Sequence, residues 1–233
     1  MENEIIQLSV VLPAYKEEEN LAIILPKIKE ELLKLNLEHE IIVIDTLQAM
    51  DETRRVCADN KATYINRELG NNYGDAIRTG INNVNGQFVI FMDADGSHSP
   101  EFIENLYNEK DCADVVIASR YTKGGNTENN KILILMSLIV NILYSVVLNL
   151  KCKDVSNSFK LYKASQLKSL KLKCNNFDIV EEIMYKLKKN NKDIVFLEIP
   201  YTFKKRIFGK TKRNLFLFIL TYVFTIIKLR FGK

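Results

Sequence analysis

The sequence predicts an α/β fold with an open, mixed, mostly parallel β-sheet flanked by helices. Two observations support this prediction. Between Leu8 and Arg120, short apolar runs alternate with segments of helical period, which is typical of strand–helix–strand units. The apolar runs also end in proline, aspartate or another polar residue. Because ligands bind beyond the carboxyl ends of the strands in such sheets, the second observation predicts where the functional site lies.

The first strand and helix have the clearest patterns. Leu8–Leu12 is apolar throughout, as expected for a strand buried on both faces, and Pro13 ends it. Glu17–Glu31 has apolar residues on one helical face and glutamates in the first turn, where the helix dipole favours acids. Pro26 is expected to bend this helix. The other expected strands are Glu40–Ile44, Ala62–Ile65, Phe88–Met92 and Asp114–Ala118, and the other expected helices are Asp51–Asn60, Asn72–Asn83 and Glu101–Tyr107.

Two long apolar segments follow the predicted sheet. Ile132–Leu150 has 19 residues without a charge, a length that suits a transmembrane helix. Polar residues nevertheless recur in it every four positions, at Ser137, Asn141, Ser145 and Asn149. This polar stripe favours an amphipathic helix that lies on a membrane or packs against a partner. Leu215–Ile227 is shorter and has basic flanks, which predicts a membrane-surface helix, with a core helix as the alternative.

The charge is distributed unevenly. Residues 200–233 contain nine basic and no acidic residues, whereas residues 1–199 contain 24 basic and 29 acidic residues. A cationic tail on an acidic body indicates an anionic partner, such as a phosphate or a lipid headgroup. Because no nucleic-acid-binding motif accompanies the tail, we do not expect a nucleic-acid partner.

Cysteine and histidine residues indicate little chemistry. The four cysteines have no CxxC spacing, so no zinc site is predicted, and without a secretory signal we expect reduced thiols. His39 and His98 are the only histidines, which leaves no evident histidine-based triad.

The most informative motif is FVIFMDADGSHSPE at Phe88–Glu101. Residues i and i+2 of a strand point to the same side, so Asp93 and Asp95 can face one ligand. Carboxylates at the end of a buried strand are costly unless a cation lies between them. Mg²⁺ and Mn²⁺ prefer carboxylate oxygens and are often shared with substrate phosphates. The motif therefore predicts a site for Mg²⁺ or Mn²⁺, with an aspartate-rich turn as the alternative.

Six segments of the sequence are informative in combination: VVLPAYKEEENL at Val10–Leu21, IIVID at Ile41–Asp45, the stretch Asn71–Asp95, SRYTKGG at Ser119–Gly125, DVSNSFKLY at Asp154–Tyr162 and PYTFKKRIFGKTK at Pro200–Lys212. Together they resemble the family 2 glycosyltransferases of the GT-A fold, and in particular the polyprenyl-phosphate sugar transferases typified by dolichol-phosphate mannose synthase. The resemblance extends from about Leu8 to Lys212.

The resemblance implies a role for individual residues. Nucleotide-sugar binding is implied for Pro13, Tyr15, Glu17, Asp45, Gly74, Asp93, Ala94, Asp95, Arg206 and Lys212. The implied metal ligands are Asp93 and Asp95, with Ser97 as a weak ligand. The implied catalytic residues are Asp95, Arg120 and Arg206, and Arg206 lies on a mobile basic loop with Gly209 as a hinge. Acceptor binding is implied for Arg120, Lys131 and Ser137.

The sequence departs from the family pattern at three places. The family's paired aspartates are replaced by Asp45-Thr46, and Ser158 takes the place of a usual glycine. Ser97 stands where the family often has glutamine or serine. An arginine is expected four residues before Ser137 to hold the acceptor phosphate, and that residue is Leu133. Lys131 lies nearby in sequence but on a different helical face.

The resemblance implies an inverting, metal-dependent glycosyltransferase that moves a sugar from a GDP- or UDP-linked donor to a polyprenyl phosphate. A family 2 enzyme that acts on a sugar hydroxyl is the main alternative, and it would need a general base. The candidate bases are Asp154, Asp178, Glu181 and Glu182. A nucleotidyltransferase and a non-catalytic scaffold are further alternatives.

The expected organisation has four parts: a nucleotide-sugar-binding core at 1–130, an interfacial helix at 131–151, the rest of the catalytic domain at 152–212 and a membrane-interface helix at 213–233. We expect a peripheral or interfacially anchored protein on the cytoplasmic face of a membrane. A homo-oligomer is possible.

Overall fold

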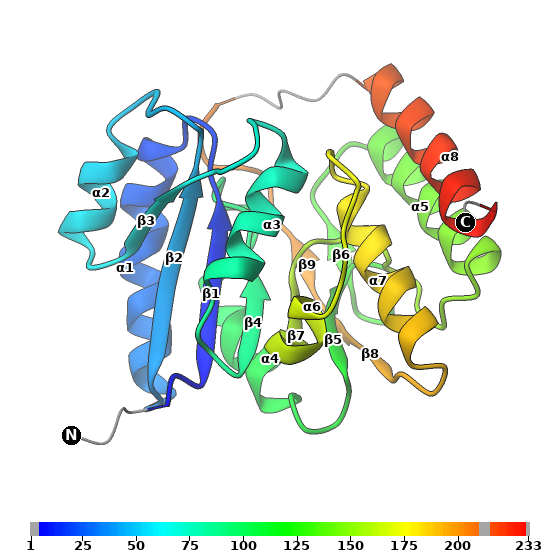
Figure 1. Cartoon of the computed structure of the whole chain (residues 1–233), viewed down its shortest axis with the longest axis horizontal. Coiled ribbons are helices and arrows are strands. Elements are labelled where there is room, and N and C mark those ends of the chain that lie inside the picture. The colour runs from blue at the N-terminus through cyan, green and yellow to red at the C-terminus, as the bar shows by residue number, and fades with distance from the viewer. Residues whose placement is uncertain (1–4, 210–214, 232–233) are drawn as a thin grey trace.

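A computed structural model describes residues 5–209 and 215–231 of the chain. Its main sheet has seven strands in the order β3-β2-β1-β4-β7-β5-β8, with helices on both faces (Figure 1). The strands are β1 Leu8–Pro13, β2 His39–Asp45, β3 Thr63–Asn66, β4 Phe88–Phe91, β5 Val115–Ser119, β7 Lys160–Lys163 and β8 Phe196–Pro200, and a second sheet pairs β6 Asn126–Thr127 with β9 Thr202–Phe203. The helices are α1 Glu18–Lys34, α2 Thr53–Asp59, α3 Tyr73–Asn83, a 3₁₀ turn Pro100–Phe102, α4 Ile103–Asn108, α5 Lys131–Val147, α6 Ala164–Lys168, α7 Ile179–Asn190 and α8 Leu215–Phe231.

The predicted fold class is confirmed, and each strand and helix expected between Leu8 and Arg120 is present. The sequence patterns did not predict β7, which is antiparallel to both of its neighbours, β4 and β5. The other pairings in the main sheet are parallel. Because β7 lies between β4 and β5, Arg120 at the end of β5 is one strand further from Asp93 than consecutive pairing would place it.

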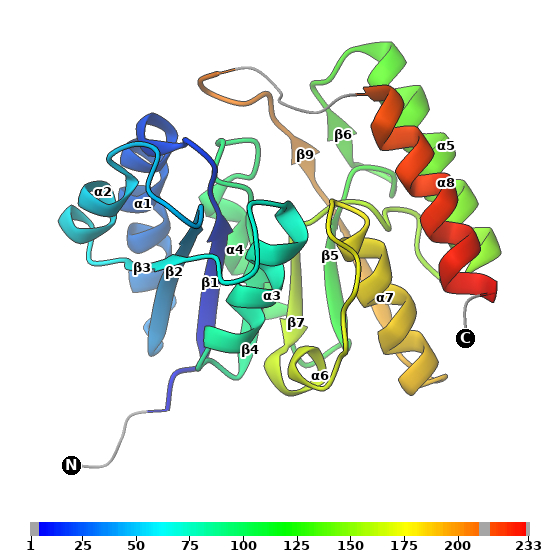
Figure 2. The same ribbon diagram turned by 45° about the horizontal axis from the view of Figure 1, so that its top comes forward.

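The core consists of two apolar layers on opposite faces of the sheet. Figure 2 shows the sheet between its covering helices. Alternate residues of one strand supply both layers: Val11 of β1 contributes to the layer under α3 and α7, whereas Val10 and Leu12 contribute to the layer under α1 and α4. This alternation follows from the two-residue period of a strand. It also explains why the parallel strands are apolar throughout.

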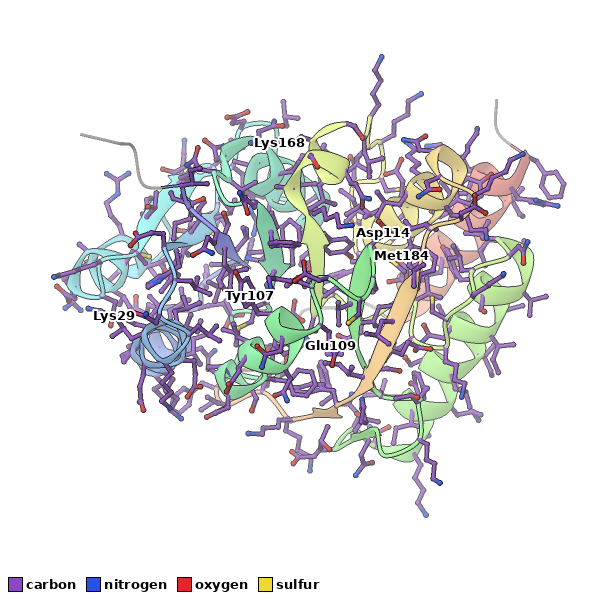
Figure 3. The ribbon with its side chains drawn as sticks, turned by 90° about the horizontal axis from the view of Figure 1, so that it is seen from below. Lys29, Tyr107, Glu109, Asp114, Lys168 and Met184 are labelled. Carbon is purple, nitrogen blue, oxygen red and sulfur yellow. The ribbon has the colours of Figure 1, made fainter. Side chains whose placement is uncertain are left out.

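The end of the sheet opposite the site is closed by polar contacts. Figure 3 views this end and labels Asp114 and Lys168. The Asp114 carboxylate accepts hydrogen bonds from Lys163 Nζ at 3.1 Å, Gln166 Nε2 at 3.0 Å and the Val195 backbone N–H at 3.0 Å. These bonds join β5 to β7, α6 and the segment before β8, so Asp114 stabilises the fold at a distance from the carboxyl ends of the parallel strands.

Helices α5 and α8 lie side by side at one edge of the molecule (Figures 1 and 2). The Tyr144 hydroxyl of α5 donates to the Tyr222 carbonyl of α8 at 2.9 Å, and both side chains are buried. Thr225 of α8 donates to Asp178 just before α7 at 2.5 Å. In the described part of the chain, none of the helices combines the length and apolarity needed to cross a membrane.

Asn141 and Ser145 of the polar stripe bond inside the protein, whereas Asn149 is exposed. Asn141 is fully buried, and Ser145 donates to the Leu150 carbonyl at 2.7 Å. Asn149 lies beyond the end of α5 with a positive φ of 54°. The outward face of α5 is apolar instead, with Ile132 70% and Val146 72% exposed. Packing within the fold therefore accounts for the polar side chains of this helix, and its position at a membrane stays a prediction.

Candidate active site

Asp93 lies just beyond the carboxyl end of β4, where the backbone turns. One of its carboxylate oxygens, Oδ1, accepts a hydrogen bond from Ser158 Oγ at 3.0 Å and lies 3.5 Å from the Tyr73 hydroxyl. Its backbone N–H donates to His98 Nδ1 at 2.9 Å. The carboxylate is therefore oriented by neighbours from α3 and from the turn before β7. Ser158, one of the departures from the family pattern, thus contacts Asp93, the first of the two expected metal ligands.

His98 supports this turn from inside the protein. Its ring is fully buried and stacks on Phe159 with centroids 4.6 Å apart. Burial lowers the pKa of His98 below its ordinary value, so the ring is neutral near pH 7. Because Nδ1 accepts the Asp93 N–H, the ring proton resides on Nε2, which is 3.9 Å from Asp93 Oδ2. Sequence reasoning used His98 only to exclude a triad and missed this role.

Asp95 is held by its own turn. Its Oδ1 accepts hydrogen bonds from the Ser97 backbone N–H at 3.0 Å and from Ser97 Oγ at 2.6 Å. Gly96 between them has a φ of +81°, a conformation that favours glycine. Ser97 is buried and orients Asp95 in this structure. Ala94, between the two aspartates, is also buried.

The basic loop that follows β9 is closed over the Asp95 turn. Arg206 Nη2 lies 2.9 Å from Glu17 Oε1 and 3.5 Å from Asp95 Oδ2. The Ile207 N–H donates to the Asp95 carbonyl at 2.9 Å. Asn20 of α1 also contacts this loop, because its Oδ1 accepts the Phe208 N–H at 3.0 Å. The structure thus brings Glu17, Asp95 and Arg206 together from segments far apart in sequence.

A cavity of about 220 Å³ is lined by this loop and by the start of α1. It is lined by Lys16, Glu17, Glu18, Glu19, Asn20, Asp51, Arg206, Phe208 and Gly209. Both Gly209, the expected hinge, and Arg206 belong to its wall. Lys212, which the resemblance places in nucleotide-sugar binding, lies outside the described residues.

The residues expected to contact the nucleotide lie at the ends of β1 and β2. Pro13 is the last residue of β1, and Tyr15 beyond it is 36% exposed. Asp45 ends β2, is fully buried and accepts a hydrogen bond from the Tyr64 hydroxyl at 2.9 Å. Burial raises the pKa of Asp45 above its ordinary value. Thr46, the departure from the family motif, donates to the Gln48 carbonyl at 2.6 Å.

Arg67 connects these loops and was not predicted from the sequence. It is 4% exposed, and its guanidinium donates to the backbone carbonyls of Ala14 and Asn71, the latter at 2.7 Å. Its backbone N–H donates to the Asp45 carbonyl at 2.9 Å. An arginine after a short strand has no distinctive local pattern, so only the folded loops reveal its role.

Gly74 is a close-packing position. A Cβ atom there would lie 2.4 Å from the Cys174 carbonyl oxygen and 2.8 Å from Asn175 backbone atoms. The Gly74 N–H donates to the Asn175 carbonyl at 2.8 Å. Close packing against this backbone thus gives a structural reason for a glycine in this helix.

Arg120 follows β5 and forms a two-pronged ion pair with Asp154. Its Nε donates to Asp154 Oδ2 at 2.8 Å and its Nη2 donates to Oδ1 at 2.7 Å. Asp154 is fully buried, and burial alone would raise its carboxyl pKa, but the Arg120 charge outweighs burial and holds that pKa below its ordinary value. The Arg120 guanidinium also lies 5.6 Å from the centre of the Phe203 ring.

The four candidate general bases are all buried. Asp154 is paired with Arg120, and Asp178 accepts a hydrogen bond from Thr225. Glu182 accepts bonds from Lys186 and the Cys174 N–H. Glu181 is fully buried on α7, and burial raises its pKa to about 8. None of these four carboxylates is available to a substrate hydroxyl in this arrangement.

Besides Arg120, two residues of α5, Lys131 and Ser137, were expected to bind the acceptor. Lys131 begins the helix and is exposed. The backbone carbonyl of Ser137 accepts a bond from Asn141 Nδ2 at 2.9 Å, and its Oγ lies 3.4 Å from the same nitrogen. Leu133, which lies between them in sequence, is partly exposed. It occupies the position where the family resemblance implies an arginine.

The Asp93–Ser97 turn fits a hard divalent cation. Within the described ranges, no three side chains of His, Cys, Asp or Glu gather as a metal site. Mg²⁺ commonly needs only one or two protein carboxylates, because substrate phosphates and water complete its coordination. Asp93 and Asp95 provide two carboxylates, and the Arg206 guanidinium beside Asp95 indicates that this carboxylate attracts a cation.

Comparison with known proteins identifies the family. The model of the family described as Glycosyl transferase family 2 matches residues 9–170. The chain belongs to glycosyl transferase family 2. It is therefore a transferase enzyme, and its open, mostly parallel sheet with flanking helices is the GT-A fold, as predicted from the motifs.

Two relatives have names that concern lipid phosphates. A dolichol-phosphate mannosyltransferase of Pyrococcus furiosus is 29% identical over 215 residues, which cover 88% of this chain and 59% of the relative. This chain therefore spans less than two thirds of that protein. An undecaprenyl-phosphate mannosyltransferase of Micrococcus luteus is 27% identical over 217 residues, which cover 88% of this chain and 86% of the relative.

A solved structure supports the fold. Glucosyl-3-phosphoglycerate synthase of Mycobacterium tuberculosis, in complex with Mn²⁺, uridine diphosphate and glucosyl-3-phosphoglycerate, superposes with a TM-score of 0.73 at 16% identity. The match covers 96% of this chain and 80% of that chain. At this identity the likeness concerns the fold alone.

Proposed function

We propose that this family 2 glycosyltransferase moves a sugar from a GDP- or UDP-linked donor to a polyprenyl phosphate at a membrane surface, with inversion at the anomeric carbon. The observation that supports it best is the convergence of Asp93, Asp95 and Arg206 at the carboxyl end of β4, with Arg120 at the end of β5. The names of the two lipid-phosphate relatives are consistent with this acceptor class.

The donor diphosphate would be bound between the Asp93–Ser97 turn and the basic loop. Asp93 and Asp95 would hold Mg²⁺ or Mn²⁺, which would neutralise charge on the departing diphosphate. Arg206 would exchange its contacts with Glu17 and Asp95 for contacts with phosphate oxygens, since arginine suits two-pronged phosphate binding. Asn20 and Ile207 would hold the loop over the donor and restrict access of water.

The acceptor is proposed to be a phosphate because none of the four candidate bases is available for a hydroxyl. A phosphate oxygen is already ionised near neutral pH and can attack the anomeric carbon as the bond to the donor diphosphate breaks. The nucleoside diphosphate leaves with the bonding electron pair, so no proton needs to be removed. A sugar hydroxyl would need a base within hydrogen-bond reach, and the four candidates are buried and mostly paired.

The surface of α5 and α8 supports a membrane-bound acceptor. Both helices turn polar side chains inward and large apolar side chains outward, among them Leu135 58%, Phe224 72% and Phe231 76% exposed. Exposed apolar side chains together with cationic ones, such as Lys228 and Arg230 on α8, are typical of interfacial helices. We therefore propose peripheral association through these two helices.

A transfer assay tests the function. GDP- and UDP-linked sugars would be paired with a polyprenyl phosphate or with free sugars, with Mg²⁺ or Mn²⁺ present. We expect a glycosylated lipid phosphate and one nucleoside diphosphate for each sugar transferred. Transfer only to sugar hydroxyls would refute the lipid-phosphate acceptor, and release of pyrophosphate would indicate a nucleotidyltransferase instead.

Asp95→Asn provides the variant for the metal site. We expect it to lose transfer and also the metal-dependent thermal stabilisation by the nucleotide sugar, because a ligand bound well above its dissociation constant stabilises the folded state. The matched control is Asp111→Asn, an exposed aspartate 78% accessible at its side chain. Equal loss in both variants would argue against a specific role of Asp95.

A further inference from the structure

One hydrogen-bonded chain joins helix α5 to Arg120. Asn141 lies on the inward stripe of α5 and is fully buried. Its Nδ2 donates to Ser156 Oγ at 3.0 Å, and its Oδ1 accepts the Ser156 backbone N–H at 2.9 Å. Ser156 therefore has both its side chain and its backbone fixed by one amide on α5.

Ser156 in turn contacts the guanidinium. Arg120 Nη2 donates to Ser156 Oγ at 3.0 Å, in addition to its bond to Asp154. With Nε also bound to Asp154, three of the five guanidinium N–H groups have acceptors. Among the residues that the structure describes, none accepts a hydrogen bond from Nη1, so Nη1 is the edge that remains for an anionic ligand.

Removing the amide would affect more than one bond. A buried N–H or carbonyl without a partner is costly, and truncating Asn141 would remove the partner of the Ser156 N–H in a partly buried region. Ser156 would then reorient, and the guanidinium would keep Asp154 as its anchor but lose the contact that fixes its rotation. Among the described residues, Asn141 bonds Ser137 and Ser156 but not Arg120, so its influence passes through Ser156.

We infer that Asn141 is a positioning residue that acts through Ser156 to orient Arg120 toward the acceptor phosphate. This inference rests on the proposed function for its catalytic consequence. Asn141, on the polar stripe of α5, then has a specific role. Through it, the helix that would lie at the membrane also sets the orientation of the Arg120 guanidinium. This role further accounts for a polar side chain that is fully buried in an otherwise apolar helix.

The primary experiment compares Asn141→Ala with Ser145→Ala. Ser145 lies one turn further along the same stripe, and its hydroxyl bonds the Leu150 carbonyl instead of Ser156, so it is the matched control. We expect Asn141→Ala to raise the acceptor KM about tenfold, which corresponds to the loss of about one buried hydrogen bond, while the donor KM stays unchanged. A rise in both KM values, or an equal effect in Ser145→Ala, would overturn the inference.

Two further variants test the route. Ser156→Ala removes only a hydroxyl at a partly exposed residue and should fold even if Asn141→Ala does not. It is expected to raise the acceptor KM similarly, and the double variant should be no worse than either single variant, because both act on one chain of contacts. Additive effects would contradict a shared route through Arg120.

A spectroscopic measurement separates this inference from the proposed function. In the free full-length protein, the NMR signal of the Arg120 Nε–H reports the orientation of the guanidinium without any substrate. We expect the signal to shift in Asn141→Ala and Ser156→Ala and to stay in place in Ser145→Ala. An unmoved signal in the first two variants would refute the positioning role. If the wild-type protein transfers no sugar to lipid phosphate, the function fails while this signal still decides the role of Asn141.

Discussion

Substituting Gly96 by alanine is expected to destabilise the closed basic loop. Gly96 has a φ of +81°, and a Cβ there would lie 2.5 Å from Ile207 Cδ1 and 2.6 Å from Ile207 Cγ1. The added methyl group therefore has two costs, one in the backbone and one in the side chain of the loop. Because Ile207 is 43% exposed, its side chain can move away, and the protein should still fold.

The two costs have different magnitudes. A non-glycine residue in the left-handed region costs about 1–2 kcal/mol, and forcing Ile207 off its rotamer adds about 0.5–1.5 kcal/mol. Gly209→Ala provides a control for the first cost alone, because Gly209 has the same φ of +81° and its nearest recorded neighbour is Arg206 Cζ at 4.0 Å. Gly96→Ala should thus lose more stability than Gly209→Ala by about 0.5–1.5 kcal/mol.

The assay is equilibrium denaturation of Gly96→Ala, Gly209→Ala, Ile207→Ala and the Gly96→Ala/Ile207→Ala double variant. Shortening Ile207 removes both close atoms, so the double variant should be more stable than the sum of its single changes predicts. The donor KM should also rise in Gly96→Ala, since the displaced loop includes Arg206. Equal losses at Gly96 and Gly209, with additive changes in the double variant, would refute the reasoning.

Three other predictions concern stability and the membrane surface. The pKa of Glu181 is raised to about 8 from 4.5, so the folded state binds a proton that the unfolded state lacks between those pH values, and the free energy of unfolding should fall as pH rises through that window by up to about 1.4 kcal/mol per unit. Urea denaturation at several pH values should show that the unfolding free energy of Glu181→Gln depends less on pH than that of the wild type. An unchanged pH dependence would contradict the assignment to Glu181. Asp154→Asn should destabilise by about 3–5 kcal/mol at neutral pH because it leaves a buried guanidinium without its anion, and the wild-type contribution should disappear as pH falls below about 4, since the Asp154 pKa is lowered from 3.8. A loss under about 1 kcal/mol would mean that Arg120 finds another partner. Finally, Phe224→Glu should weaken flotation with anionic vesicles, whereas Leu33→Glu, which alters a 63% exposed residue of α1, should not; equal flotation of both variants would argue against α8 as the contact surface.

The candidate site was predictable where its residues follow the strands directly. Asp93 and Asp95 could be assigned to the end of β4 because an apolar run and two carboxylates at i and i+2 are a local pattern. The same holds for Gly74 and Gly80 in α3, where a Cβ at Gly80 would lie 2.8 Å from Val11 Cγ1. Helix interiors disfavour glycine, so its presence there already indicated close packing.

The partners of the site residues were not predictable in the same way. Arg206 lies beside Glu17, 189 positions away in the sequence, and Arg120 pairs with Asp154, 34 positions away. The motifs suggested that both arginines meet phosphate, and the structure adds that protein carboxylates already contact both. Such pairings depend on which loops meet at one end of the sheet, and short sequence windows contain no information about that.

The sequence by itself determined the alternation of strands and helices, the position of the paired aspartates and the amphipathic character of α5. Each of these depends on residue periodicity within one element. Only the tertiary structure decided that β7 inserts antiparallel between β4 and β5, and that Asn141 of the polar stripe is buried against Ser156. A four-residue strand has too few residues for a distinctive period, and a polar stripe shows only that a helix has two faces. Which face is buried depends on the hydrogen-bond partners that the rest of the fold provides, because a buried amide is stable only where they are present.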